Sequence, residues 1–186
     1  MIIGLSGTFS SGKDILADHL QEKFGLMHIS LGDIVREIAQ EQRGSVERPV
    51  LQEVADDLRH KYGGSVLVDK AIDRYHNSIR TYAGVVINGI RSLGEAKAVK
   101  ELGGTLIYID APIELRYTRM QTRNKDGEAR ISLEAFQERE AKELASGLSD
   151  ADFNLIKIKE MSDNQIINQG TLEEFYLAAE KALSFA

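Results

Sequence analysis

The sequence of 186 residues contains no cysteine, which excludes disulfide bonds and thiolate metal sites and favours a cytoplasmic location. No apolar run approaches the roughly 20 residues that a membrane-spanning helix needs, so we expect no membrane partner. Residues 1–5 are apolar but too short for a signal peptide, and they predict a strand. Repeats and low-complexity tracts are also missing, and the length suits one domain, residues 1–186, with a full core.

An excess of basic charge is absent as well. The chain carries 23 lysine and arginine residues against 29 aspartate and glutamate residues, a formal net charge of -6. This balance argues against nucleic acid as the main partner. An anionic ligand must therefore be met by individually placed arginines. The histidines show no metal-ligand spacing, so we interpret them as structural or surface side chains.

The most specific motif follows the opening apolar run, where residues 7–13 read Gly-Thr-Phe-Ser-Ser-Gly-Lys. A strand that leads through a glycine-containing loop into a helix forms a phosphate-binding loop, because backbone N–H groups and the positive helix end then face the anion. Lys13 would reach the terminal phosphates as a mobile charge. The alternative is a Gly/Ser-rich turn that binds nothing. The residues that we expect to hold the nucleotide here are Gly7, Thr8, Phe9, Ser10, Ser11, Gly12, Lys13 and Asp14.

Asp14 stands where such loops usually carry a serine or threonine that ligates magnesium. A carboxylate beside a triphosphate would repel it unless a metal ion lay between them, and carboxylate oxygens are good ligands for hard cations. Asp14 could instead complement the helix N-terminus and face away from the ligand. We prefer the metal role, direct or through water.

Short apolar runs alternate with segments of helical periodicity along the chain. This alternation predicts a right-handed parallel α/β fold, a five-stranded sheet flanked by helices, with ligands at the carboxyl ends of the strands. Ser65, Ser92 and Thr171 are predicted helix N-caps. We expect strands at residues 1–5, 26–29, 85–87, 105–109 and 153–158, the last extended or followed by 165–167.

Polar side chains follow three of the predicted strands at the point where each strand ends. The phosphate loop follows the first, Asp33 and Arg36 follow the second, and Asn88 and Arg91 follow the third. Because the carboxyl ends of parallel strands meet at one edge of a sheet, we expect these groups to converge. Asp33 also fits a helix N-cap, and both roles can hold together.

These motifs resemble the P-loop nucleoside-monophosphate kinase group, which includes dephospho-coenzyme A kinases, deoxynucleoside-monophosphate kinases and adenylate kinases. Residues 12–14 resemble the phosphate loops of phage-type deoxynucleotide kinases and animal phosphomevalonate kinases. Residues 29–36 resemble the acceptor-binding segment of adenylate kinases, and residues 86–91 resemble the segment that carries Asp-Gly and a phosphate-binding arginine. Residues 168–174 are similar to the close of dephospho-coenzyme A kinase-like chains. Asn88 departs from the aspartate that usually helps to hold magnesium.

The resemblance implies an ATP- and Mg2+-dependent small-molecule kinase that transfers the γ-phosphoryl group to a nucleoside or deoxynucleoside monophosphate. Lys13 would neutralise the β- and γ-oxygens, and Asp14 and Asp33 would hold the metal. Four residues would contact the acceptor, two of them, Asp33 and Arg91, also acting in catalysis with Lys13. These acceptor residues are Asp33, Arg36, Asn88 and Arg91.

A stripe of arginines follows the fourth predicted strand, with Arg116, Arg119 and Arg123 spaced by three and four. Such a stripe is equally typical of a solvated helix face. Because it leads into residues 121–147, which contain Arg130, we interpret that segment as a lid. Arg119 and Arg123 would bind the nucleotide, and Arg130 would stabilise the transferred phosphate.

The predicted core comprises residues 1–33, 84–120 and 148–186, and residues 34–80 form an acceptor-binding insertion. Arg48, Gln52 and Arg59 lie in that insertion and could contact the acceptor. Two rival functions stay open: a dephospho-coenzyme A kinase, and a nucleotide-binding regulatory protein with weak or no transferase activity. The acceptor's identity is open too, as is the choice between monomer and homodimer.

Overall fold

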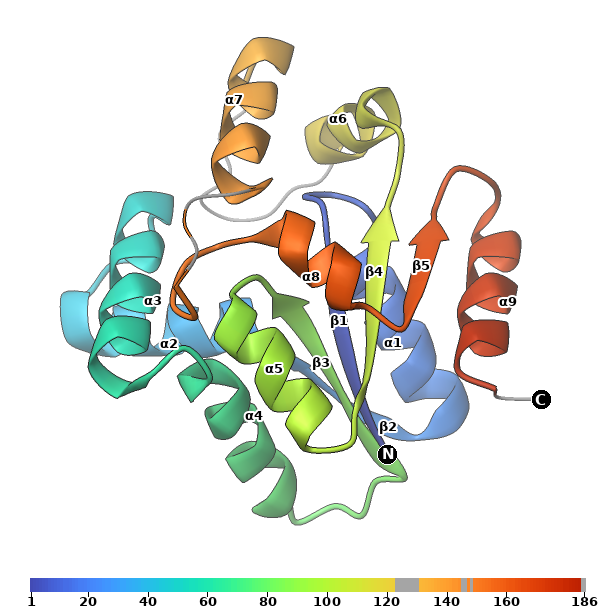
Figure 1. Ribbon diagram of the computed structural model, residues 1–186, viewed down its shortest axis with the longest axis horizontal. Helices are drawn as coiled ribbons and strands as arrows, with labels where there is room; N and C mark the ends of the chain where they lie inside the picture. Colours follow the sequence, from blue (N-terminus) through green and yellow to red (C-terminus); the bar gives the residue numbers. More distant parts are fainter. Residues whose placement is uncertain (123–130, 145–146, 148, 185–186) are drawn as a thin grey trace.

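The computed structural model describes residues 1–122, 131–144, 147 and 149–184. In this part of the chain, a five-stranded sheet has the order β2-β3-β1-β4-β5, and every neighbouring pair is parallel (Figure 1). The predicted parallel α/β sheet is therefore confirmed. Its strands are β1 (Ile2–Gly7), β2 (Leu26–Ser30), β3 (Gly84–Ile90), β4 (Thr105–Asp110) and β5 (Asn164–Ile167).

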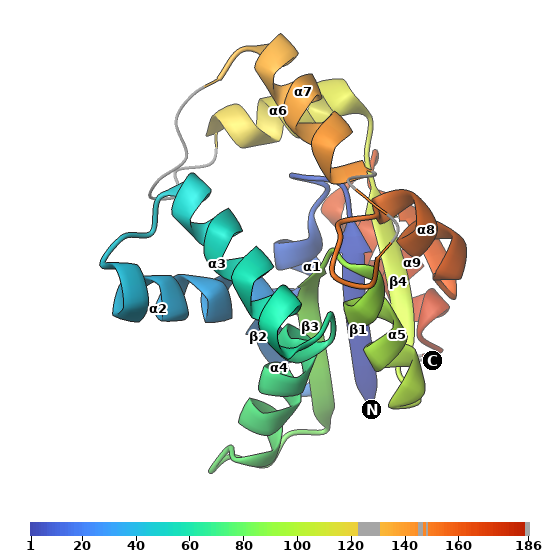
Figure 2. The same cartoon turned by 60° about the vertical axis from the view of Figure 1, so that its left-hand side comes forward.

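Helices cover both faces of the sheet. Helices α1 and α9 pack on one face, and α2 to α5 with α8 contribute to the core on the other. Figure 2 shows α6 and α7 beyond the carboxyl ends of β1 and β4. None of the described helices has the length and apolar character that crossing a membrane requires. The helices are α1 (Lys13–Phe24), α2 (Leu31–Arg43), α3 (Arg48–Tyr62), α4 (Val66–His76), α5 (Leu93–Glu101), α6 (Ile113–Thr122), α7 (Leu133–Leu144), α8 (Leu155–Met161) and α9 (Leu172–Ala182).

Side-chain alternation along the strands gives the sheet two separate cores. In β4, Ile107 and Ile109 are buried against α1 and α9, whereas Leu106 and Tyr108 are buried in the larger core on the opposite face. Successive residues of a strand point to opposite faces, so a strand that is apolar throughout must be covered on both sides. The sheet is therefore the middle of three layers, and its carboxyl edge is the place where polar groups can gather.

The prediction of a last strand over residues 153–158 is wrong, because α8 occupies most of that segment and β5 follows it. Asn154 begins the helix, and its side-chain oxygen accepts the N–H of the residue three positions later at 3.0 Å. Leu155 and Ile158 are both buried, and residues three apart share one face of a helix but opposite faces of a strand. The apolar pattern was compatible with both structures, and the cap decides for the helix.

Of the predicted caps Ser65, Ser92 and Thr171, two are confirmed in full and Ser65 is confirmed in position only. Ser92 and Thr171 form full capping boxes at the starts of α5 and α9. Ser65 precedes α4 but makes no side-chain capping bond, since its own backbone is already helical at φ -86° and ψ -14°. Its hydroxyl donates to the carboxylate of Asp69 instead, at 2.8 Å.

Candidate active site

The loop between β1 and α1 has the strand–loop–helix geometry that the sequence predicts. Gly7 and Gly12 have φ of 137° and 108°, in the region that favours glycine. A methyl group on Gly7 would lie 1.9 Å from the carbonyl oxygen of Ile109, and one on Gly12 would lie 2.4 Å from Nδ2 of Asn168. Both glycines are therefore required by space as well as by backbone conformation.

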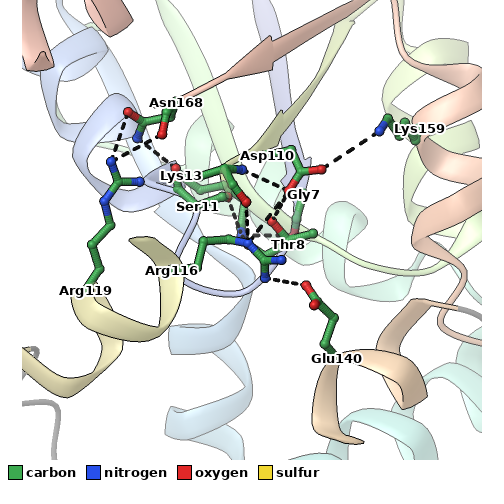
Figure 3. Close-up of polar contacts among 11 residues, drawn as sticks. Gly7, Thr8, Ser11, Lys13, Asp110, Arg116, Arg119, Glu140, Lys159 and Asn168 are labelled. Carbon is green, nitrogen blue, oxygen red and sulfur yellow. Dashed lines mark hydrogen bonds and ion pairs between the residues drawn. The ribbon is translucent and has the colours of Figure 1, made fainter. Parts of the chain in front are cut away.

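Lys13 opens α1, and its side chain is held inside the curl of the loop (Figure 3). Its ammonium donates to the carbonyl oxygens of Gly7 at 3.0 Å and Thr8 at 2.6 Å. The residue is only 9% exposed. A positive charge that is partly desolvated and surrounded by backbone dipoles interacts strongly with an anion placed in the same loop.

Asp14 and Asn88, the two departures from the usual kinase pattern, are in direct contact. The side-chain amide of Asn88 donates to Oδ1 of Asp14 at 2.6 Å. Asn88 is 2% exposed, and its Oδ1 has no hydrogen-bond partner among the described residues. A carboxylate and a neighbouring amide oxygen are both ligands that Mg2+ accepts. These residues therefore fit a magnesium site completed by nucleotide phosphates and water.

Asp33 does not cap α2, contrary to one of its two predicted roles. The N-cap is Ser30, whose hydroxyl accepts the backbone N–H of Asp33 at 3.2 Å. The Asp33 carboxylate, 60% exposed, pairs with Arg36 at 2.8 Å. In the described chain, no group of three or more His, Cys, Asp or Glu side chains could hold a metal ion, so a metal would depend on ligands from the nucleotide.

Arg36 and Arg91 come from adjacent strand ends, as predicted. Ser30, at the end of β2, is in register with Asn88 of β3. Arg36 lies in the second turn of α2, and Arg91 directly follows β3. The guanidinium of Arg91 lies 6.0 Å from the ring centroid of Phe153.

Asp110 is a polar group of the site that the sequence analysis missed. It ends β4, and its Oδ1 accepts the hydroxyl of Thr8 in the phosphate loop at 2.7 Å. Lys159 of α8 approaches its other carboxylate oxygen at 3.9 Å. The rule that found Asn88 and Arg91, a polar residue at a strand's carboxyl end, applied equally to Asp110.

Asn168 is the second missed residue, and it joins the phosphate loop to α6. Its Nδ2 donates to the carbonyl oxygen of Ser11 at 2.8 Å, and Arg119 donates to its backbone and side-chain oxygens at 3.3 Å each. Nη1 of Arg119 is buried and has no hydrogen-bond partner in the described part of the chain. Arg119 is thus tied to the loop and is not part of a solvated face. Arg123 and Arg130 lie outside the described residues.

Helix α7 packs against the phosphate loop through Phe136, which is 2% exposed. The ring centroid of Phe136 lies 5.8 Å from those of Phe9 and Tyr117. Arg116 of α6 forms an ion pair with Glu140 of α7 and donates to the backbone after β4. The loop is therefore covered on this side by aromatic contacts and a buried arginine.

A groove of about 700 Å3 lies between α6, the end of β5 and α9. Leu115 of α6 lines this groove and is 39% exposed. The buried side of α6 is taken by Arg116 and Met120. Phe175 also lines the groove, and its ring lies 3.4 Å from the position that a methyl group on Gly12 would occupy. The groove therefore adjoins the phosphate loop.

Comparison with known proteins identifies the family. A model of the AAA domain matches residues 3–145. The UPF0200 protein of Hyperthermus butylicus is 31% identical over 186 residues, which cover 99% of this chain and 94% of that protein. This chain is a UPF0200 protein with an AAA domain. It spans about half of a longer relative, the UPF0200/UPF0201 protein of Archaeoglobus fulgidus, which is 30% identical over 177 residues covering 94% of this chain and 52% of the relative.

Solved structures support the fold of this UPF0200 protein. TT1252 from Thermus thermophilus has a TM-score of 0.62 at 21% identity, covering 100% of this chain and 96% of that one. Shikimate kinase from Aquifex aeolicus has a TM-score of 0.55 at 17% identity, covering 99% and 96%. At these identities the likeness concerns fold alone. The coarser prediction of a P-loop kinase-like fold is confirmed, and the resemblance to nucleoside-monophosphate or dephospho-coenzyme A kinases stays a prediction.

Proposed function

We propose that this protein is an ATP- and Mg2+-dependent phosphotransferase that moves the γ-phosphoryl group to a nucleoside or deoxynucleoside monophosphate. One observation carries the proposal: a glycine-built phosphate loop with Lys13 inside it lies at the same sheet edge as the residues that follow β2 and β3. Phosphoryl transfer between two anions needs converging cations more than it needs covalent chemistry. Lys13, Arg36 and Arg91 supply such cations.

On the donor side, the loop N–H groups and Lys13 would hold the phosphates of ATP. Arg119 would approach from α6, where its buried Nη1 has no hydrogen-bond partner among the described residues. The groove beside Gly12, lined in part by Leu115 and Phe175, would take the nucleoside base. These features together favour a nucleoside triphosphate as the donor.

Asp14 and Asn88 would hold the metal, with Asp33 as a further candidate. When bound, Mg2+ neutralises charge on the β- and γ-phosphates. The Asn88 amide holds Asp14 in place through its hydrogen bond, and its buried side-chain oxygen, which has no hydrogen-bond partner among the described residues, would be a further ligand. Burial of Asn88 limits competing water, which strengthens these interactions.

On the acceptor side, Arg36 and Arg91 would bind the acceptor's phosphate. An acceptor oxygen would form a bond to the γ-phosphorus while the bond from that phosphorus to the β–γ bridging oxygen breaks, and ADP leaves. A phosphate acceptor is already an anion and needs no general base. A hydroxyl acceptor must lose a proton, and Asp33 would then be the residue to take it.

We propose that residues 34–80 form the acceptor-binding insertion and that residues 121–147 form a lid. The described part of that lid packs Phe136 onto Phe9 of the phosphate loop. Such a contact covers the loop and would favour transfer over hydrolysis by excluding water. Arg130 would act from this segment on the transferred phosphate.

An acceptor screen tests the proposal. Purified protein, ATP and Mg2+ are incubated with nucleoside monophosphates, deoxynucleoside monophosphates and dephospho-coenzyme A, and acceptor-dependent ADP release is measured. Product from a monophosphate supports the proposal, and product from dephospho-coenzyme A alone replaces the acceptor class. Calorimetric ATP binding without product across the panel would favour a regulatory nucleotide-binding protein. Absence of ATP binding would refute the donor site itself.

A further inference from the structure

A buried ion pair joins α3 to the start of α5. Glu95 is fully buried and Arg59 is 3% exposed. Oε1 of Glu95 accepts two N–H groups of Arg59, from Nε at 3.0 Å and from Nη2 at 2.8 Å. The sequence analysis placed Arg59 among residues that could contact an acceptor, but its side chain is occupied inside the protein.

The other carboxylate oxygen of Glu95 holds the backbone that carries Arg91. Oε2 accepts the N–H of Arg91 at 2.7 Å and the N–H of Ser92 at 3.1 Å. All of these bonds involve one carboxylate, so the position of the Arg91 backbone depends on where Glu95 sits. The position of Glu95 depends in turn on the planar guanidinium of Arg59.

Phe153 forms a second connection between the same two arginines. Its ring centroid lies 4.9 Å from the guanidinium of Arg59 and 6.0 Å from that of Arg91. The backbone is tied here as well, since the N–H of Asn154 donates to the carbonyl oxygen of Arg91 at 3.1 Å. Arg91 is thus held from two elements, by Glu95 at its N–H and by residues 153–154 at its carbonyl.

Stability alone gives a weak reason for this arrangement. Removing two charges from water costs free energy that their attraction often fails to recover, and apolar side chains of similar volume frequently stabilise a core as well or better. The pair does something that apolar side chains cannot do. It fixes hydrogen-bond acceptors in place beside Arg91 and Ser92, at the carboxyl end of β3 where the candidate site lies.

We infer that Arg59 is a positioning residue for Arg91, acting through Glu95 and Phe153 to set the guanidinium that binds the acceptor's phosphate. The inference rests on the proposed function, in which Arg91 contacts a phosphate group. It also assigns a purpose to the part of α3 that carries Arg59: this part of the proposed acceptor-binding insertion helps to build the acceptor site from behind.

Arginine NMR signals test this inference directly. The phosphate loop is saturated with Mg2+ and a non-hydrolysable ATP analogue, and inorganic phosphate is then titrated while the Nε–Hε and backbone signals of Arg91 are followed. Arg59→Lys keeps the positive charge but cannot donate the two N–H groups that Arg59 directs at Glu95. We expect the dissociation constant of phosphate at Arg91 to be about tenfold higher in this variant. Affinity for the ATP analogue should stay unchanged.

Two further variants separate positioning from general loss of structure. Phe153→Leu leaves the ion pair in place and should weaken phosphate binding at Arg91 by about threefold. Lys157→Met removes an exposed lysine that pairs with Glu160 on α8, outside the proposed acceptor-binding insertion, and it should change nothing. Thermal melting of each variant checks that the fold persists.

Several outcomes would overturn the inference. An unchanged phosphate affinity in both Arg59→Lys and Phe153→Leu would refute it, as would equal weakening of phosphate and ATP-analogue binding. A wild-type protein that binds the ATP analogue but shows no response of Arg91 to phosphate would refute it while leaving the donor site intact. Failure to bind the analogue at all would refute the proposed function, and the inference with it.

Discussion

The donor and acceptor sides of the candidate site are held by different kinds of interaction. On the donor side, Lys13 and Asn168 are 9% and 3% exposed, and both bond to backbone carbonyls of the phosphate loop. On the acceptor side, Arg36 pairs with Asp33 at the surface, where their side chains are 33% and 60% exposed. Backbone and glycine geometry thus fix the donor groups, whereas exposed ion pairs, typically worth 0–1 kcal/mol, leave the acceptor groups able to rearrange.

This difference suits a transfer reaction with one common donor and an acceptor that must enter and leave. Pre-set N–H groups and charges lower the cost of binding the phosphates that every cycle presents. The buried Arg59–Glu95 pair is informative here, because it holds the backbone of one acceptor residue, Arg91, through buried hydrogen bonds like those of the donor side. The predictions below test whether the two sides really differ, beginning with the largest effect.

Replacement of Lys13 should produce the largest loss. Lys13→Ala removes the charge that we place on the β- and γ-phosphates, and transfer should fall by on the order of 10²–10³-fold. The fold should survive, since the hydrogen bonds of the Lys13 ammonium to Gly7, Thr8 and Ser11 lie within the phosphate loop. Rates are measured with the best acceptor from the screen and folding by thermal melting.

The matched control is Lys157→Ala, which removes a half-exposed lysine from α8. It should leave the transfer rate unchanged. An unaltered rate in Lys13→Ala would contradict the role given to Lys13, and an equal loss in both variants would point to an effect of charge at a distance.

Gly12→Ala should nearly abolish nucleotide binding, because the added methyl group would lie 2.4 Å from Nδ2 of Asn168. The loop would have to open or Asn168 would have to leave Ser11 and Arg119. We expect ATP affinity to fall by about 100-fold, in keeping with the loss of several positioned phosphate contacts. Calorimetry with ATP and Mg2+ measures the effect.

Gly44→Ala separates backbone strain from collision. Gly44 ends α2 with φ of 65°, and nothing lies within 4 Å of a methyl group placed there. Only the left-handed conformation is then unfavourable, by about 1–2 kcal/mol, and ATP affinity should be preserved. Similar losses of affinity in the two glycine variants would mean that the packing around Gly12 is not what matters.

The Asp14–Asn88 contact predicts a rescue. Asp14→Ser and Asn88→Asp each restore half of the usual kinase pattern. Asp14→Ser leaves this pair of residues with no carboxylate, and Asn88→Asp gives the pair two. Each single variant should weaken Mn2+ binding in the presence of ATP by about tenfold. Asp14→Ser removes the carboxylate ligand, and Asn88→Asp replaces the amide that holds Asp14 by a second carboxylate that repels it. The double variant, with one carboxylate again, should recover most of the affinity.

Electron paramagnetic resonance of Mn2+ reads the metal directly, without reference to activity. Additive losses in the double variant would show that the two residues do not share a metal. Recovery would show that either position, 14 or 88, can supply the carboxylate to one metal site. The asparagine at position 88 would then be no sign of lost function.

The sequence predicted those parts of the site that local rules determine. The phosphate loop needs glycines at Gly7 and Gly12, a lysine and a helix start, and all of these lie within one short segment, residues 7–13. The strand-end rule likewise predicted that Arg36 and Arg91 follow strands that end at one edge of the sheet, and the paired parallel strands β2 and β3 have that arrangement. Consecutive residues and sheet periodicity are the two signals that a single sequence carries well.

What the sequence could not supply were contacts between distant segments. Asn168 lies 157 positions from Ser11, whose carbonyl it binds, and Thr8 lies 102 positions from Asp110. The burial of Arg59 was equally hidden, because its partner Glu95 looked like an ordinary capping-box residue. The burial of a polar residue can be recognised only once the distant segment that packs against it is known.

The exposed pair of the acceptor side gives a sharper test of the comparison with the donor side. Arg36→Ala should raise the apparent KM for the acceptor severalfold, because one of two phosphate-binding cations is lost. The melting temperature should hardly change, since an exposed i,i+3 pair contributes little to stability. A large loss of stability would place Arg36 among the rigid groups and remove the contrast between the two sides.

The smallest effect concerns the scaffold beneath the donor side and depends on pH. Burial alone would raise the pKa of Asp163, but hydrogen bonds from Lys100 and from the N–H of Leu106 lower it below its ordinary value. A depressed folded-state pKa stabilises the protein above the unfolded value, and that contribution disappears as the pH falls through the folded value. Asp163→Asn should therefore lower the melting temperature near neutral pH by no more than about 2 °C, with the difference from wild type vanishing in acid. The control is Glu160→Gln, which removes a carboxylate from an exposed i,i+3 pair. A pH-independent difference for Asp163→Asn would show that Asp163 contributes packing at the start of β4 and that the ionisation of its carboxyl group is not what stabilises the protein.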